Sequence, residues 1–230
     1  MVHSGMTGVA DPLDTDINFF TSHGAVGDID RAFNNLGRPF EITRTNIKRW
    51  SVGSPAQAVL DCLEFLIAKY GIKPGEVKQL HIHLSPRAAR VVDGREMPDI
   101  NVQYLVAVML TDGTVSFTAS HDHGRMGEPG ILALRRRMTL VPDNRLGRRP
   151  ELRQAIVEIT LESGRQVRHR VNAVRGTTAN PMTLAEVEAK AAELMAPVTG
   201  AGAAKKVIRG VRRIERARSL AALVALMQGK

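Results

Sequence analysis

The sequence contains a single cysteine, Cys62, among its 230 residues. One thiol excludes an intramolecular disulfide and a cysteine-based zinc cluster, and it is typical of a reducing compartment, so we expect a cytoplasmic protein. The first residues lack the basic stretch and apolar core of a secretory signal. The longest apolar runs, such as LAALVALM at 220–227, are far too short to cross a bilayer, so we expect no membrane partner.

Aromatic residues are also scarce, at two Tyr, one Trp and six Phe, while the net charge is +9. A charge of this sign attracts nucleic acid, acidic lipid, an acidic partner protein or a carboxylate substrate. Few aromatic side chains leave few surfaces on which single-stranded bases stack. We therefore expect no nucleic-acid partner, and a basic nucleic-acid-binding protein is the less favoured alternative.

The clearest element is a helix over residues 54–70. Ser54 is in the position of an N-cap, Pro55 in that of the first helical residue, and Gln57 in that of the residue that closes a capping box. Apolar residues then recur at helical spacing, and Gly71 follows where a helix commonly ends.

The remaining pattern mixes strands and helices. VKQLHIHLS at 77–85 alternates as a half-buried strand, 137–142 resembles a short strand, and AIVEITLESGRQVRHRV at 155–171 resembles a hairpin turning at Ser163-Gly164. RPFEITRTNIKRW at 38–50 is predicted to be a strand or an extended arm. Helices are predicted from Asp99 or Asn101 to about 113 and, behind a second capping box at Thr183, to about Met195, followed by a small-residue linker and two further helical segments. The fold class is therefore α+β.

Histidines are concentrated at two places, His81 and His83 on one strand and His121 and His123 around Asp122. A His-x-His pair on a strand can bind a metal, and the second cluster would supply further ligands if its loop folded back. Nothing in the spacing requires that fold, and polar residues on a sheet face and a loop explain the pattern equally. We expect no metal site.

Lys48 is a more favourable candidate for chemistry. Only a short loop separates it from the predicted helix at 54–70, whose first N–H groups and positive dipole end attract anions. A lysine beside that terminus suits a substrate carboxylate. The alternative is that Lys48 and Arg49 are solvated at the end of an extended arm, and that Gln57 serves only the capping box.

Four segments together resemble the 2-methylcitrate dehydratase-like (MmgE/PrpD) family. They are IKRWSVGSPAQAVLDCLEFL, MPDINVQYLVAVMLTDGTVSF, SHDHGRMGEPGILALRRRMTLVPD and NPMTLAEVEAKAAEL, in the family's order and spacing. The resemblance implies a mixed α+β lid domain at 46–180. It also implies that an N-terminal segment, 1–45, and C-terminal helices, 181–230, complete an all-helical domain.

The resemblance implies a function as well. Family members include 2-methylcitrate dehydratase, cis-aconitate decarboxylase and iminodisuccinate epimerase, which act on small polycarboxylates without metal or organic cofactor. Full members are about twice as long as this chain. We therefore expect the lid-bearing half or subunit of such a lyase or isomerase, with a second subunit supplying the missing helical domain, or a homo-oligomer. The alternative is a non-catalytic partner or regulatory subunit that keeps the lid fold.

The site residues implied by the resemblance surround the start of the 54–70 helix. Lys48 matches the family lysine at the mouth of the lid, as a carboxylate contact or acid-base residue, and Arg49, Gly53 and Gln57 are expected to bind substrate beside it. Family members often have a histidine in this turn, where Gly53 and Gln57 stand here. Tyr104 is expected to contribute a hydroxyl, and His121 an imidazole that titrates near neutral pH.

Overall fold

The computed structural model describes residues 2–8, 16, 18–22, 34, 36–38, 40–148 and 153–228. The chain divides into two compact units, Met1–Arg44 and Thr45–Lys230. In the first unit, the described elements are short: η1 (Val2–Ser4), α1 (Phe19–Ser22) and η2 (Glu41–Arg44). About half of the predicted N-terminal segment 1–45 lies outside the described residues, and nothing in the rest tests its assignment to a helical domain, which stays a prediction.

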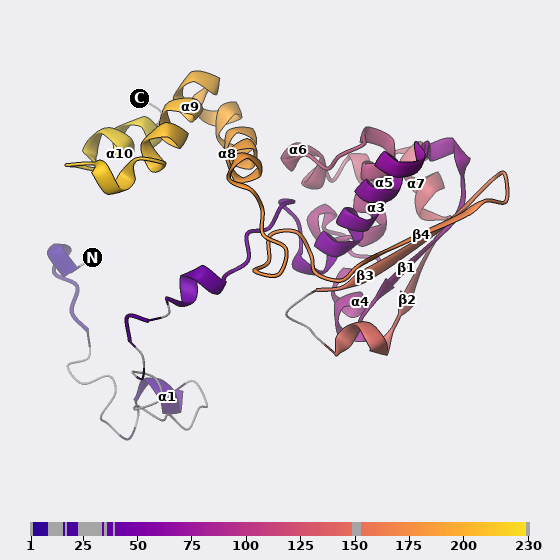
Figure 1. The fold of residues 1–230 in the computed structure, drawn as a ribbon, viewed down its shortest axis with the longest axis horizontal. Coiled ribbons are helices and arrows are strands. Elements are labelled where there is room, and N and C mark those ends of the chain that lie inside the picture. Colours follow the sequence, from indigo (N-terminus) through magenta and orange to yellow (C-terminus); the bar gives the residue numbers. More distant parts are fainter. Residues whose placement is uncertain are drawn as a thin grey trace. The chain divides into compact units, whose positions relative to one another are not determined.

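The second unit is built on a four-stranded mixed sheet in the order β2-β1-β3-β4 (Figure 1). β1 runs parallel to β2 and antiparallel to β3, and β3 and β4 form the predicted hairpin. The strands are β1 (Val77–Leu84), β2 (Met138–Pro142), β3 (Ala155–Leu161) and β4 (Gln166–Val171). All of the strands predicted from alternating residues between 77 and 171 are confirmed.

Helices precede, connect and follow these strands, which confirms the α+β class. The α-helices of this unit are α3 (Gln57–Tyr70), α4 (Pro86–Val92), α5 (Val102–Asp112), α6 (Phe117–Ser120), α7 (Pro129–Arg135), α8 (Leu184–Thr199), α9 (Ala201–Val211) and α10 (Ala221–Met227). Single 3-10 turns adjoin several of them: η3 (Ser54–Ala56), η4 (Pro74–Glu76), η5 (Pro98–Ile100), η6 (Arg125–Gly127), η7 (Asn144–Gly147) and η9 (Ile214–Arg216).

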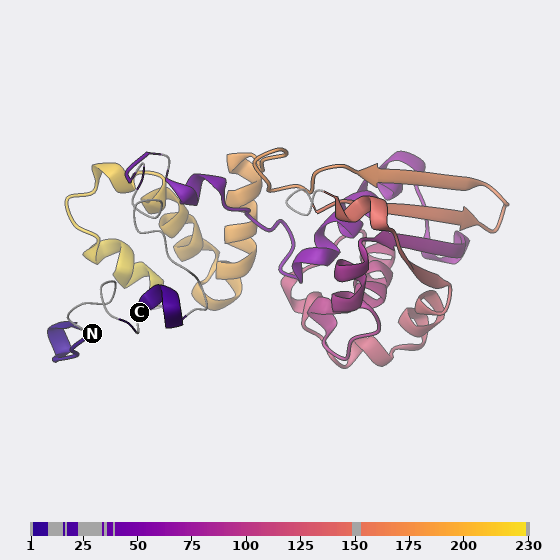
Figure 2. The same cartoon turned by 90° about the horizontal axis from the view of Figure 1, so that it is seen from below.

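The core lies between one face of the sheet and the helices that cover it. α3 packs against β3 and β4, and α5 packs in turn against α3 and α7 (Figures 1 and 2). Alternation along β1 sends Leu80, Ile82 and Leu84 into this core and leaves His81 and His83 half-buried on the other face. α5 begins at Asn101, whose side chain accepts from the Tyr104 amide, as the N-cap prediction requires.

For 38–50 the sequence leaves open a strand or an extended arm, and the part of this range that the structure describes excludes the strand; the predicted linker after Met195 is wrong. No strand forms among the described residues of 38–50, because η2 occupies 41–44 and Ile47 pairs through its amide with the Gly176 carbonyl alone, not with a strand. α8 starts at its predicted capping box but continues to Thr199, accommodating Pro197 in its last turn. The alanine-rich stretch beyond favours helix, so the predicted linker reduces to Gly200 between α8 and α9.

Across the described part of the chain, no helix combines the length and the apolar character that a bilayer crossing needs.

Candidate functional site

The segment that carries Lys48 is fixed at both ends by backbone contacts. On one side, the Ile47 amide donates to the Gly176 carbonyl at 2.9 Å. On the other, the Gly53 amide donates to the Asp99 carbonyl at 2.8 Å, and a Cβ at Gly53 would lie 2.9 Å from Ile100 Cγ2. The loop from 47 to 53 is therefore held in place, and the close approach of Gly53 to η5 gives this glycine a packing role.

Gln57 holds the middle of the same loop. Its side-chain nitrogen donates to the carbonyls of Trp50, at 2.8 Å, and Val52, at 3.2 Å, and its oxygen accepts from the Trp50 amide. Only 2 % of Gln57 is exposed, so its hydrogen-bonding capacity is used internally. The predicted capping box at Ser54 is therefore wrong: residues 54–56 form η3, and no side chain caps α3.

Arg49 is partly exposed and pairs with Glu64. The two terminal nitrogens of its guanidinium, Nη1 and Nη2, each lie 2.5 Å from a Glu64 carboxylate oxygen, and its central carbon lies 4.6 Å from the centre of the Trp50 ring. This planar, two-point ion pair neutralises the arginine. Arg49 and Glu64 line an open cavity of about 570 Å³ between α3 and the end of β4.

Asp61 joins the same region to the chain that leads into α8. One carboxylate oxygen accepts from Trp50 Nε1 at 3.3 Å, and the other accepts from the Arg175 amide at 2.7 Å. Burial raises the pKa of Asp61, although these hydrogen bonds oppose the effect. The arginine of this junction, Arg175, also forms a two-point ion pair with Glu186 in the first turn of α8.

Lys48 itself is exposed, and α8 reaches it from the far end of the chain. The Lys190 ammonium donates a hydrogen bond to the Lys48 backbone carbonyl. Burial lowers the pKa of Lys190, and the positive charge of Lys48 lowers it further, while Glu193 acts in the opposite direction. The Lys190 ammonium therefore lies against the backbone of Lys48, within the reach of its charge. Lys190 and Glu193 were not among the residues predicted from sequence.

The segment that carries His121 also contacts α8, through Phe117. The His121 ring stacks on Phe117 with the ring centres 4.3 Å apart, and its Nδ1 lies 2.9 Å from both Ser120 Oγ and the Phe117 carbonyl. The Phe117 amide donates to Glu193 at 2.9 Å. The two residues of α8 that make these contacts, Lys190 with the Lys48 segment and Glu193 with the His121 segment, lie within one helical turn. Among the described contacts, none joins Lys48 directly to His121.

Tyr104 lies inside the core with no exposed surface. Its hydroxyl donates to the carbonyls of Ala119, at 2.6 Å, and Asp122, at 3.3 Å, and burial raises its pKa. The hydroxyl that was predicted to serve the cleft is therefore engaged in holding the turn that carries His121. In this structure Tyr104 positions the loop.

The histidine motifs show no gathering of metal ligands. Within the residues that the structure describes, no group of three His, Cys, Asp or Glu side chains is arranged to hold a metal ion. His83 Nε2 lies 3.2 Å from a Glu158 oxygen on the neighbouring strand, and Glu158 also pairs with Arg168. In the second motif, Asp122 accepts from the Arg125 amide at 3.0 Å, which closes the turn.

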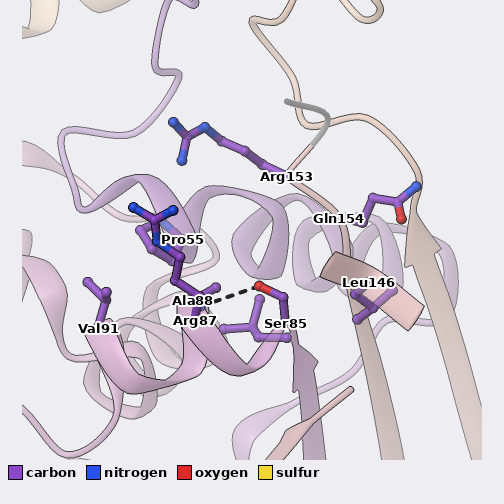
Figure 3. Close-up of a pocket in the computed structure, with 9 residues that line it drawn as sticks. Pro55, Ser85, Arg87, Ala88, Val91, Leu146, Arg153 and Gln154 are labelled. Carbon is purple, nitrogen blue, oxygen red and sulfur yellow. Dashed lines mark hydrogen bonds between the residues drawn. The ribbon is translucent and has the colours of Figure 1, made fainter. Parts of the chain in front are cut away.

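A separate cavity of about 350 Å³ lies where β1 leads into α4. Its floor is largely apolar, and Figure 3 shows the Arg87 guanidinium beside Pro55, with Arg153 extending toward the same side. Ser85 Oγ, also in the lining, accepts from the Ala88 amide at 3.3 Å. None of the residues predicted to be catalytic or substrate-binding lines this cavity, and its two arginines were not singled out from the sequence.

Comparison with known proteins identifies the domain that these elements form. A sequence model of the MmgE/PrpD C-terminal domain, from a family of dehydratases and isomerases, matches residues 50–216. A search among curated proteins found no match. The matched range contains the whole sheet, α3 to α9 and the loop of Trp50, and it begins two residues after Lys48. The chain therefore belongs to the MmgE/PrpD family, of which it carries the C-terminal domain.

Proposed function

We propose that this chain is the lid-bearing part of a cofactor-free lyase or isomerase that acts on a small di- or tricarboxylate. The observation that carries the proposal is that Lys48 is an exposed cation on a fixed loop. Its ammonium is exposed on a loop held at Ile47 and Gly53, and among the described residues no carboxylate pairs with it. Family membership supports the reaction class, because its members are generally lyases and isomerases.

The chemistry begins with removal of a proton α to a substrate carboxylate. The electron pair of the broken C–H bond moves onto the carboxylate to give an enediolate, and a cation beside its oxygens stabilises that charge. Lys48 has this role in the proposal. The proton passes to a base in the cleft, for which His121 is the candidate on this chain. For dehydration, the C–O bond of a β-hydroxyl then breaks and the protonated base gives up its proton, so that the hydroxyl leaves as water. For epimerisation, an acid on the opposite side of the cleft protonates the enediolate carbon.

Arg49, Gly53 and Gln57 take indirect roles in this scheme. Glu64 neutralises Arg49, and Gln57 is saturated by the Trp50 and Val52 backbone. These contacts support a function in positioning the loop of Lys48 rather than in touching substrate. Tyr104 has a comparable role for the turn of His121.

The residues of a complete site would come from a second subunit. Large apolar side chains remain exposed on the described C-terminal helices, and we propose that helices of the second subunit pack there. They are Leu184, Leu194 and Val198 on α8, Val211 on α9, and Val224 and Met227 on α10. Native mass spectrometry of the complex tests this: a second chain, or a symmetric copy, supports the proposal, and a stable monomer contradicts it.

Exchange of substrate protons with solvent tests the reaction. The native complex is incubated in D₂O with a panel of small di- and tricarboxylates, and loss of the α-proton signal is followed by NMR. We expect Lys48→Ala to slow the exchange about 100-fold, the cost of one charge-stabilising donor. Lys78→Ala, at an exposed lysine of β1, is the matched control. Exchange at an unchanged rate in Lys48→Ala excludes the catalytic role and favours a regulatory subunit.

A further inference from the structure

α8 presents three charged side chains to the α+β core along one face. Glu186, Lys190 and Glu193 are spaced by four and three residues, so they follow one another on the same side of the helix. Each makes a contact outside α8: Glu186 with Arg175, Lys190 with the Lys48 carbonyl, and Glu193 with the Phe117 amide. The start of the helix is fixed by the capping box of Thr183. The position of Lys190 is therefore set by contacts on both sides of it.

The surroundings of Lys190 are unfavourable for a purely structural lysine. The side chain is half-buried, its ammonium lies on the Lys48 carbonyl, and the charges that act on its pKa are the cation of Lys48 and the carboxylate of Glu193. Glu193 is itself exposed and already accepts a hydrogen bond from Phe117. A positive charge nearby and partial burial both disfavour the charged state of Lys190. An anion bound between the two lysines would relieve this repulsion.

Lys190 also has hydrogen-bonding capacity to spare. An ammonium group carries three donors, and only one is used on the Lys48 carbonyl among the described contacts. That single bond holds the side chain beside Lys48, so the remaining two donors are available close to the Lys48 segment. A carboxylate, with two oxygens and several lone pairs, can accept from these donors and from the exposed ammonium of Lys48 on the same segment.

We infer that Lys190 is a second substrate-binding cation, which holds one carboxylate of the ligand jointly with Lys48. The ligand class rests on the proposed function, and the inference deepens it by assigning a residue from the C-terminal helix to the site. α8 then does more than follow the lid: it completes the carboxylate site. Because α8 packs on the loop of Lys48, two lysines that are 142 positions apart in the sequence contact the same ligand in this inference.

Binding of propane-1,2,3-tricarboxylate to the full chain tests the inference. Calorimetric titrations are run at constant ionic strength, with acetate as a probe of non-specific charge effects. We expect Lys190→Met to weaken binding about tenfold or more, since a hydrogen bond to a charged group is lost. Lys48→Met should weaken it similarly, and the double variant should lose less than the product of the two effects. Lys206→Met, at an exposed lysine of α9, is the matched control and should bind normally.

A measurement on the unsubstituted chain guards against a variant that fails to fold. The side-chain carbon shift of Lys190 is followed by NMR against pH, with and without the tricarboxylate. A bound carboxylate should raise the pKa of Lys190, in opposition to Lys48, and the same comparison for Lys206 should show no change. An unchanged Lys190 titration, or no saturable binding to the chain, overturns the inference.

The outcomes separate this inference from the proposed reaction. Binding that depends on Lys190, without any α-proton exchange in the native complex, supports the carboxylate site and removes the proposed chemistry. Exchange that depends on Lys48, together with normal binding by Lys190→Met, supports the chemistry and overturns the role of Lys190.

Discussion

The side-chain amide of Gln57 is hydrogen bonded to both backbone groups of Trp50. Its oxygen accepts from the Trp50 N–H at 3.1 Å, and its nitrogen donates to the Trp50 carbonyl at 2.8 Å. This contact joins the first residue of α3 to the loop that carries Lys48. The geometry of the candidate site therefore depends on a buried polar residue that need not touch the ligand.

Replacement of Gln57 should destabilise the fold. Gln57→Ala leaves a buried N–H and the carbonyls of Trp50 and Val52 without their partner, which costs about 2–3 kcal/mol of the free energy of unfolding. Urea denaturation, followed by the fluorescence of Trp50, measures this directly. Gln79→Ala, at an exposed position of β1, is the control and should change stability little. Equal stability of the two variants would show that the Gln57 bonds are dispensable.

Sequence patterns predicted the position of α3 correctly but assigned Gln57 to a capping box that does not form. The reason is physical. A capping box and a loop-holding amide can have the same residue types at the same spacing, and only the tertiary position of Trp50 distinguishes them. At Thr183 the same pattern was interpreted correctly, because there Glu186 accepts from Thr183 as well as from Arg175. Local rules thus succeed where tertiary contacts agree with them.

Tyr104→Phe should loosen the turn that carries His121. The substitution removes the hydroxyl that donates to the Ala119 and Asp122 carbonyls, at a cost of about 1–2 kcal/mol. We expect faster hydrogen exchange over residues 119–126, measured by mass spectrometry, and a lower urea midpoint. Tyr70→Phe, whose hydroxyl makes no hydrogen bond among the described residues, is the control. If the variant instead loses turnover in the native complex while its stability and its amide hydrogen exchange stay unchanged, Tyr104 contacts the substrate.

Gly176→Ala should disrupt the join between the loop of Lys48 and the chain before α8. Gly176 has a φ of +94°, and a Cβ there would lie 1.8 Å from the Ile47 carbonyl oxygen, so the backbone must move. We expect a loss of at least about 2 kcal/mol in stability and faster tryptic cleavage near Lys48. Gly75→Ala, where a Cβ meets open space, is the control. If Gly176→Ala is as stable as the unsubstituted chain and is cleaved as slowly, the contact between Gly176 and Ile47 does not hold the loop of Lys48 in place.

The candidate site was only partly predictable for a related reason. Lys48 was identified because it lies a short distance before a helix start and within a family motif, which are both local features. Lys190 and Glu193 have an ordinary helical spacing that is typical of a solvated face. Their importance follows from long-range contacts, with Lys48 and with Phe117, that no local pattern specifies.

The Arg175–Glu186 pair should make stability depend on acid pH. The Arg175 guanidinium, with hydrogen bonds from Thr183, lowers the pKa of Glu186 to about 2. Because this folded-state pKa lies below the ordinary glutamate value of about 4.3, the ionised pair stabilises the fold above that pH, and the contribution is lost as the pH falls toward 2. About 1 kcal/mol is expected, since both side chains are partly exposed and solvent screens the pair.

Glu186→Gln isolates this contribution. Urea unfolding of the variant and the unsubstituted chain is compared at pH 7, 5 and 3. We expect the variant to be less stable at pH 7 and the difference to shrink as the pH falls to 3, because Glu186 is then protonated in the unfolded chain while the folded chain still largely excludes the proton. Glu162→Gln, at an exposed carboxylate without an ion pair among the described residues, should show no such trend. A constant difference at all three pH values would contradict the ion-pair contribution. Glu186 would then act only through its capping hydrogen bonds, part of which a neutral glutamine retains.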